Sequence, residues 1–249
     1  MKLCDVFKDY VRYLFAGRRA EARDVVMTAH DRGITASKLL KQVIWPAMEE
    51  IDRLYREDHI SRIQEHIAVR INRMIADQLQ GYLPRAQKTG RRMVVACGAG
   101  ELEELGGQVT ADLFEAAGWI IWFLGSEVPN DEILQLIGKS EPDILCIYGT
   151  RPEGVPELRT LIDMIRGIGV CENMQIMVVG GVFNRAEGLA EEVKADLYAA
   201  DIEDALKTTE EHPVRIPTPD VPQPGRRRKR KRSPAQAAAL RKARMAMGA

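Results

Sequence analysis

Apolar residues recur at helical spacing through the first third of the chain. The expected helices cover residues 3–15, 18–32, 35–55 and 61–79, and Gly17 and Gly33 end the first two. Pro46 lies inside the third run, which predicts either a kink or two abutting helices. Ser61 and Gln64 have the spacing of a capping box at the start of the fourth helix. Four helices with short connections predict an antiparallel bundle over residues 1–84.

The period of the pattern changes after Arg91. Short apolar runs predict strands over residues 93–97, 120–124, 144–148, 176–179 and 197–199. Helical patterns lie between and after them, at residues 108–117, 131–139, 156–168, 186–194 and 202–208. This alternation predicts an α/β domain over residues 91–210 with a doubly wound, five-stranded parallel sheet of the flavodoxin or Rossmann type. The loops at 98–106, 125–129, 149–155 and 180–185 would line the crevice at its carboxyl edge.

The end of the chain has a different composition. Residues 211–225 contain five prolines and are expected to form an extended linker. Residues 226–249 hold ten basic residues and no acidic one, and a last short helix is expected at 235–247. The rest of the chain carries 26 basic and 36 acidic residues, so an acidic body precedes a basic tail. The basic residues are Arg226, Arg227, Arg228, Lys229, Arg230, Lys231, Arg232, Arg241, Lys242 and Arg244.

Clustered cations favour contact with a nucleic-acid backbone, and we expect this tail to bind DNA. The tail contains no aromatic residue, which argues against stacking on single strands. The alternative is a solubilising end with no partner.

Composition narrows the other function classes. The chain is 45% hydrophobic and 29% charged, as is ordinary for a globular protein, and no apolar run approaches the length of a membrane span. Four scattered cysteines and an N-terminus without a signal-peptide pattern predict a reduced, cytoplasmic setting. No arrangement of nucleophile, base and acid stands out at the predicted crevice, so we expect no enzymatic activity.

Three spacings resemble a known family. Glu101-Leu102-Glu103-Glu104-Leu105-Gly106 is followed after 41 residues by Tyr148-Gly149-Thr150, and Gly180-Gly181 come later. Tyr55 precedes Glu65-His66 by ten residues. This layout resembles the cobalamin-binding modules of methionine synthase, corrinoid methyl carriers and light-dependent cobalamin repressors, in which a helical bundle precedes a Rossmann-like domain. The resemblance is strongest to the repressor and methionine synthase types.

The resemblance implies roles for individual residues. Tyr55, Glu65 and His66 would form a lid over the ligand, and Gly106, Tyr148, Thr150, Gly180 and Gly181 would lie around it. Glu101 and Glu103 stand where the family has aspartate and the histidine that ligates cobalt, so no metal ligand is assigned. A carboxylate is a poorer partner for cobalt than imidazole, and Tyr148 adds a ring by the slot for the nucleotide tail. We therefore expect weak cobalamin binding or binding without a histidine ligand.

Structural roles that involve no ligand remain open for these residues. Glu101, Glu103 and Glu104 are also typical of carboxylates in the first turn of a helix. Tyr55 and His66 are also typical of residues packed within a bundle, and a Gly-Gly pair after a strand is common in this fold class.

Three functions are considered. The main hypothesis is a sensory protein that regulates transcription, with an altered cobalamin module, a DNA-binding tail and self-association into a homo-oligomer. The second is a corrinoid carrier serving a methyltransferase. The third is a scaffold that holds no ligand or another flat molecule. No membrane partner is expected.

Overall fold

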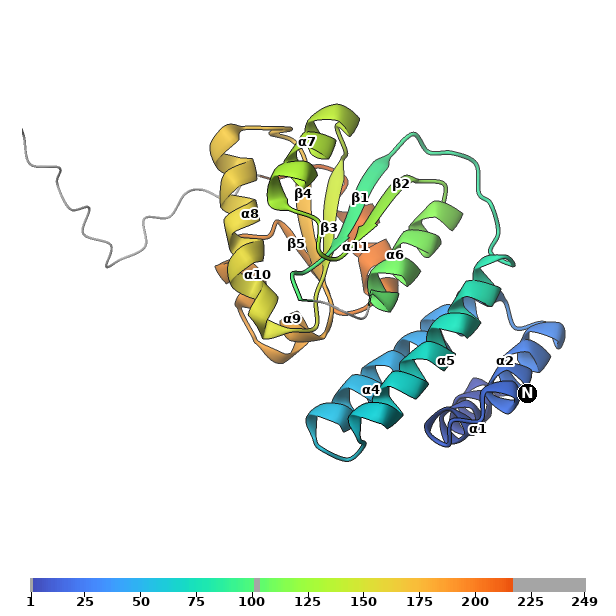
Figure 1. The fold of residues 1–249 in the computed structure, drawn as a ribbon. Coiled ribbons are helices and arrows are strands. Elements are labelled where there is room, and N and C mark those ends of the chain that lie inside the picture. The colour runs from blue at the N-terminus through green and yellow to red at the C-terminus, as the bar shows by residue number, and fades with distance from the viewer. Residues whose placement is uncertain (1, 101–103, 217–249) are drawn as a thin grey trace, which may run out of the picture. The chain divides into compact units, whose positions relative to one another are not determined.

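The computed structural model describes residues 2–100 and 104–216. The first helices begin and end close to where the sequence predicts them (Figure 1). Ser61 caps the last of them, and its side chain and that of Gln64 form the reciprocal capping box. The elements of the bundle are α1 (Leu3–Phe15), α2 (Arg19–Asp31), α3 (Ala36–Leu39), the π-helical segment η1 (Leu40–Ile44), α4 (Trp45–Arg56) and α5 (Arg62–Gln80).

The run around Pro46 forms two α-helical pieces joined by η1. Trp45 N–H donates to Leu40 O, five residues back, and Pro46 lies in the first turn of α4. A proline has no N–H and crowds the preceding turn, so one wide turn before it accommodates the ring. Asn72 of α5 supports this segment from the core, because its amide donates to Ile44 O at 3.2 Å. Tyr10 Oη of α1 donates to Asn72 Oδ1 at 2.7 Å.

The second half of the described chain forms the predicted parallel sheet. All four strand pairings are parallel, and the strand order is β2-β1-β3-β4-β5. The strands are β1 (Arg92–Cys97), β2 (Ile120–Gly125), β3 (Ile144–Tyr148), β4 (Gln175–Val179) and β5 (Leu197–Ala199). The other elements are α6 (Leu105–Ala116), α7 (Asn130–Ser140), η2 (Pro152–Gly154), α8 (Val155–Ile168), α9 (Gly181–Arg185), α10 (Leu189–Glu192) and α11 (Ile202–Glu211).

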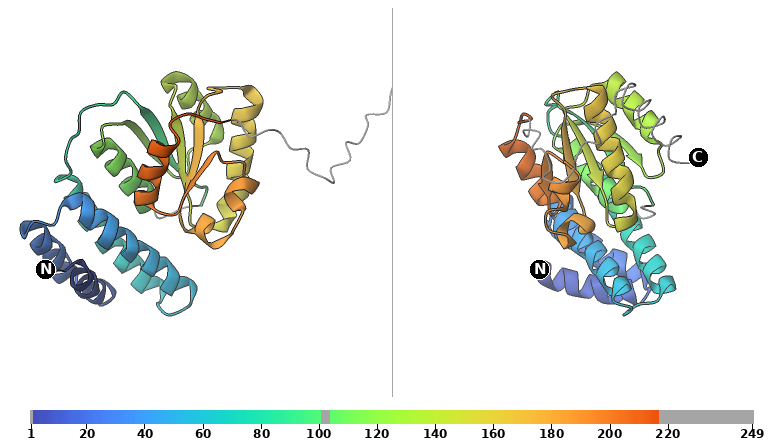
Figure 2. Two further views of the ribbon diagram at one scale, coloured as in Figure 1. Left: turned by 180° about the vertical axis from the view of Figure 1, so that it is seen from behind. Right: turned by 90° about the vertical axis from the view of Figure 1, so that its left-hand side faces the viewer.

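Alternate residues of the buried strands feed two separate cores. One core holds Val94, Leu145 and Val178 with residues of α7 and α8. The other holds Val95, Tyr148 and residues of α6, α11 and the bundle. Figure 2 shows α8 on one side of the sheet and α11 on the other. The expected fold class is confirmed.

Two local predictions differ from the structure. Helix α6 begins at Leu105, so Gly106 and Gly107 lie in its first turn and not in the preceding loop. Both face the sheet, where a Cβ at Gly106 would overlap the Tyr148 ring and one at Gly107 would lie 2.7 Å from Cys97 Sγ. The expected helix over residues 186–194 is reduced to α10, because Gly188 has a left-handed φ of +79°.

Across residues 2–100 and 104–216, none of the helices combines the length and the apolar character needed to cross a membrane.

Candidate functional site

A cleft of about 520 Å³ lies between the bundle and the carboxyl edge of the sheet. Helix α4 supplies one wall, with Glu65 and Val69 of α5 beside it. The opposite wall comes from the ends of β3 and β4 and the segments that follow them. This is the edge at which open α/β sheets bind ligands, and the cleft is large enough for an organic ligand.

The floor of the cleft is apolar and closely packed. Trp45, Met48 and Tyr148 meet there. The rings of Trp45 and Tyr148 lie edge to face, with centroids 6.1 Å apart, and Tyr148 Oη lies 3.5 Å from Met48 Sδ. Trp45 and Tyr148 are almost fully buried, so these rings form a rigid surface beneath any occupant.

Acidic and basic side chains surround this floor. Trp45 Nε1 donates to Glu49 Oε1 at 3.1 Å, and burial raises the pKa of Glu49. Arg185 of α9 donates to Asp52 Oδ2 of α4 at 3.2 Å and also to the Thr150 carbonyl. Arg185 therefore joins the bundle to the loop after β3 across one side of the cleft.

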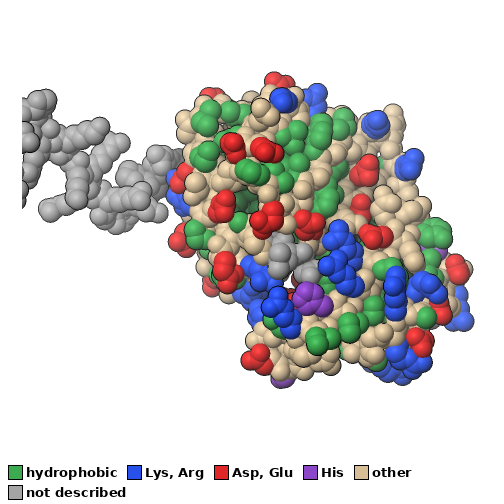
Figure 3. Space-filling model, viewed as in Figure 1, with side chains coloured by type: hydrophobic (Ala, Val, Ile, Leu, Met, Phe, Trp, Pro, Cys, Tyr) green, Lys and Arg blue, Asp and Glu red, His purple; other side chains and the backbone are tan. Residues whose placement is uncertain are grey.

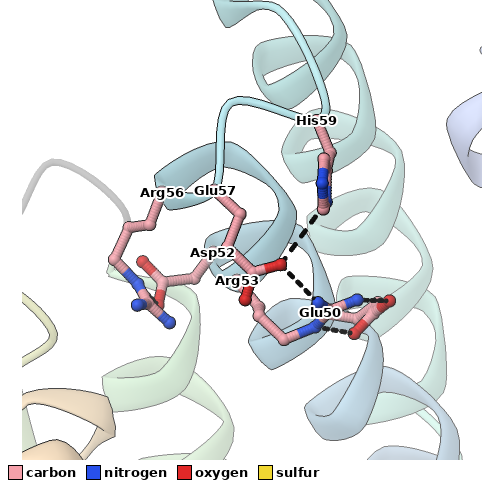
Figure 4. A network of polar contacts seen from close by, with 6 residues as sticks. All are labelled: Glu50, Asp52, Arg53, Arg56, Glu57 and His59. Atoms are coloured by element: carbon pink, nitrogen blue, oxygen red, sulfur yellow. Dashed lines mark hydrogen bonds and ion pairs between the residues drawn. The ribbon is translucent and has the colours of Figure 1, made fainter.

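A second polar network lies at the end of α4. Figure 4 shows Arg53 between Glu50 and Glu57, and His59 beside Glu57. Arg53 donates to both carboxylates, and its hydrogen bonds hold the pKa of Glu50 below the usual range. Arg53 reaches Glu50 three residues before it and Glu57 four residues after it, at the C-cap of α4, so these contacts fix side chains at the end of the helix. Arg53 and Arg56 both line the cleft.

Charges of both signs lie close together over the face shown in Figure 3. Acidic side chains gather over the left part of this face, and several basic side chains gather near its centre and lower right. A rim with hydrogen-bond donors and acceptors around an apolar floor suits a flat ligand that has polar substituents on its edge.

Six of the predicted cofactor residues meet in this cleft. Tyr55, Glu65, Tyr148, Thr150, Gly180 and Gly181 all line it. His66 is exposed and outside its lining, with Arg62 Nε 3.5 Å from His66 Nε2. Gly106 is buried beneath the Tyr148 ring, whereas Glu101 and Glu103 lie outside the described residues. The binding roles of these residues stay predictions.

Within the segment from Glu101 to Gly106, the described carboxylate of Glu104 already accepts hydrogen bonds. Glu104 Oε1 accepts hydrogen bonds from Ser126 N at 2.6 Å and from Ser126 Oγ at 2.8 Å. These bonds join the start of α6 to the loop after β2. Glu104 thus has a structural role in tying two loops of the sheet edge together.

The Gly-Gly pair makes room for the chain's own atoms. Gly180 has a φ of +121°, and a Cβ there would collide with the Gly149 carbonyl. A Cβ at Gly181 would lie 2.7 Å from Arg185 Nη1. The structure thus shows close approach of a neighbouring loop and of Arg185 at this pair, and the predicted approach of a ligand stays a prediction.

The donor set of the cleft contains no histidine among the described residues. Within residues 2–100 and 104–216, no group of three His, Cys, Asp or Glu side chains could hold a metal ion. The apolar floor and polar rim fit the flat ring and amide edge of a corrinoid. The described lining offers its cobalt no imidazole ligand.

Sequence patterns missed several residues of the cleft. Trp45, Glu49 and Asp52 lie along α4, and Arg185 lies far away in the chain. The i,i+4 pairs Trp45–Glu49 and Asp52–Arg56 were visible signals of a polar face on α4. No local pattern connects Arg185 with Asp52, because 133 residues separate them.

Comparisons with known proteins agree with this architecture. Residues 6–80 match the family described as B12 binding domain. Dimethylamine corrinoid protein 1 of Methanosarcina acetivorans is 19% identical over 196 residues, which cover 76% of this chain and 90% of that protein. Dimethylamine corrinoid protein 2 of the same organism is 21% identical over 201 residues, covering 75% and 91%. The structure of the Methanosarcina barkeri monomethylamine corrinoid protein has a TM-score of 0.76 at 16% identity, covering 84% of this chain and 99% of that one.

These relatives correct the predicted function and partner. The hypothesis of a sensor that binds DNA and regulates transcription is wrong, because the relatives are corrinoid proteins. The hypothesis depended on the cations from Arg226 to Arg232 with Arg241, Lys242 and Arg244, which lie outside the described residues. A run of positive charge indicates an anionic partner, but it does not distinguish DNA from other anionic partners.

Two further predictions agree with the comparisons. The expected absence of enzymatic activity is consistent with relatives that are named as corrinoid proteins and not as methyltransferases. The expected cofactor class, cobalamin, agrees with the family match. The match of residues 6–80 to the B12 binding domain, the sheet topology and the likeness to corrinoid proteins over most of the chain support the resemblance to cobalamin-binding modules, in which a helical bundle precedes a Rossmann-like domain.

Proposed function

We propose that this chain is a corrinoid carrier that serves a methyltransferase. The observation that carries the proposal is the cleft between α4 and the sheet edge, in a chain that matches corrinoid proteins over three quarters of its length. Trp45, Met48 and Tyr148 would support the ring, and Glu49, Asn184 and Arg185 would hold its polar edge. A bound corrinoid supplies a cobalt that can accept a methyl group and pass it on.

The chain's own residues would position the ligand and limit its exposure to water. The Arg185–Asp52 pair holds the bundle against the loop after β3. Tyr55 of α4 and Glu65 of α5 line the cleft as well and would contact the ligand from the side of the bundle.

Gel filtration of the full chain after incubation with cobinamide tests the ligand and its place. We expect the absorbance of cobinamide to co-elute with the protein. Glu65→Trp narrows the cleft and should reduce the bound fraction by about tenfold or more, since steric overlap in a packed site costs 1–3 kcal/mol. Ile67→Trp is the matched control, because Ile67 is exposed on the same helix outside the cleft lining. Equal loss in both variants, or no co-elution with the wild type, contradicts the proposal.

The partner is tested separately. Affinity purification of the tagged full chain, loaded with cobinamide, from its own cells should recover a methyltransferase identified by mass spectrometry. Recovery of the loaded chain without any methyltransferase contradicts the carrier role and leaves corrinoid binding intact.

A further inference from the structure

The Tyr148 side chain closes the bottom of the cleft. Tyr148 is the last residue of β3 and has 2% of its surface exposed. Its ring lies on the α6 side of the sheet, between Gly106 beneath and Met48 and Trp45 beside it. Protein interiors are close-packed, so this buried ring fills the floor of the cleft where it lies.

Helix α6 confirms how tightly this ring is seated. A Cβ on Gly106 would overlap ring atoms Cε2 and Cζ and lie 2.6 Å from Oη. A Cβ on the next residue, Gly107, would lie 2.7 Å from Cys97 Sγ and 3.6 Å from Tyr148 Cβ. Backbone, not a flexible side chain, therefore supports the ring from below.

A narrow hollow lies between the cleft and a larger hollow. It shares Arg151 with the cleft lining and Gly98 and Ile147 with the larger hollow, and its volume of about 10 Å³ is close to the space of a single water molecule. The larger hollow, of about 280 Å³, lies on the α7 and α8 side of the sheet and shares no lining residue with the cleft. Among the described residues, the passage out of the cleft on this side is therefore too narrow for more than a water molecule.

A cobalamin consists of a flat corrin ring and a nucleotide arm below it, whose benzimidazole can coordinate the cobalt. A protein that replaces this base must supply another ligand and a space for the displaced arm. The described lining offers neither a histidine nor an open floor. Resting on the proposed function, we infer that this cleft takes corrinoids that lack the arm or keep the base on cobalt, and that Tyr148 is the residue that excludes a displaced arm.

Titration of the full wild-type chain at pH 7.5 with two probes tests this selectivity. Cobinamide, which has no arm, should bind at least as tightly as methylcobalamin. Bound methylcobalamin should keep the red colour of the base-coordinated form. A preference for methylcobalamin of more than tenfold, or a change of its bound form to the yellow of the base-free compound, overturns the inference. Failure of both probes to bind overturns the proposed function as well.

Variants at the floor identify the residue. Tyr148→Ala opens the space of one ring and should shift the affinity ratio by about tenfold in favour of methylcobalamin, in the range that one removed group gives in a packed pocket. Tyr148→Phe keeps the ring and should keep the wild-type ratio. Phe114→Ala removes another buried ring of the same core, outside the cleft lining, and controls for general loosening. A folded Tyr148→Ala variant with the wild-type ratio overturns the assignment, and the wild-type titration decides the selectivity even if this variant does not fold.

Discussion

Substitution of Gly106 by alanine gives a sharp test of how the cleft floor is built. The new Cβ would overlap the Tyr148 ring, and overpacking of this kind costs about 1–3 kcal/mol. Alanine recovers roughly 0.5–1 kcal/mol of helix propensity in α6, so the net destabilisation should be about 1–2 kcal/mol. With a denaturant slope of about 2–3 kcal/mol per molar, the urea midpoint should fall by roughly 0.5 M.

Combination with Tyr148→Ala separates this contact from other effects. Tyr148→Ala alone should cost about 3–5 kcal/mol because it leaves a cavity. In its background, Gly106→Ala should become neutral or slightly stabilising, which gives a coupling of about 1–2 kcal/mol. Gly107→Ala is the matched control, because its Cβ would press on Cys97 Sγ and only touch Tyr148 Cβ. Its cost should therefore persist in the Tyr148→Ala background.

Urea unfolding followed by far-ultraviolet circular dichroism measures the wild type and all five variants. If the costs of Gly106→Ala and Tyr148→Ala add within about 0.5 kcal/mol, the two residues do not share a packed contact. If Gly107→Ala is relieved as much as Gly106→Ala, the relief is general loosening. Either result would refute the reasoning about the floor.

Three further predictions concern other contacts. Asn72→Leu removes the hydrogen-bond partner of buried Tyr10 Oη and of Ile44 O, and it should lower the free energy of unfolding in urea by about 2–4 kcal/mol. Tyr10→Phe should cost less. A cost below about 0.5 kcal/mol for Asn72→Leu would contradict the network. Arg185→Ala should lower the free energy of unfolding by only about 1 kcal/mol, since both side chains of the Arg185–Asp52 pair are about a third exposed. The loss should shrink in 1 M NaCl. Stability equal to that of the wild type at low salt would show that the pair contributes nothing. Burial, with Glu115 and Asp77 nearby, raises the pKa of Asp112 to about 6, so its ionised form opposes folding above that pH. Asp112→Asn should therefore gain about 1 kcal/mol at pH 7.5, after solvent screening, with the gain fading as the pH falls towards 4; a gain independent of pH would rule out this cause.

Local patterns predicted much of the fold. The capping box at Ser61 and the alternation of strands and helices depend on near neighbours in sequence, and the structure contains both. The spacing of the three motifs also led to the cleft, since Tyr148, Thr150 and Gly180 line it together with Tyr55 and Glu65.

Contacts between distant segments could not be predicted in this way. The loop before α6 is shorter than the sequence predicts, because Gly106 and Gly107 lie in the first turn of the helix. A Cβ at either glycine would come too close to Tyr148 or Cys97 on the sheet. The Gly-Gly pair is predicted to contact a ligand, and the sequence gives no sign that Gly181 also makes room for Arg185, which pairs with Asp52. The predicted regulatory function is wrong for a related reason, because it depended on the charge of the tail, which carries no information about the cleft.

Amide hydrogen exchange of the full chain, with and without a saturating excess of cobinamide, tests the central claim most directly. A ligand in the cleft should slow exchange in α4 and in the loop after β3, because exchange reports local opening of these segments. Exchange in α1, which lies outside the cleft lining, should stay unchanged. No difference on addition of cobinamide, or protection confined to segments outside the cleft, would contradict a corrinoid carried between the bundle and the sheet.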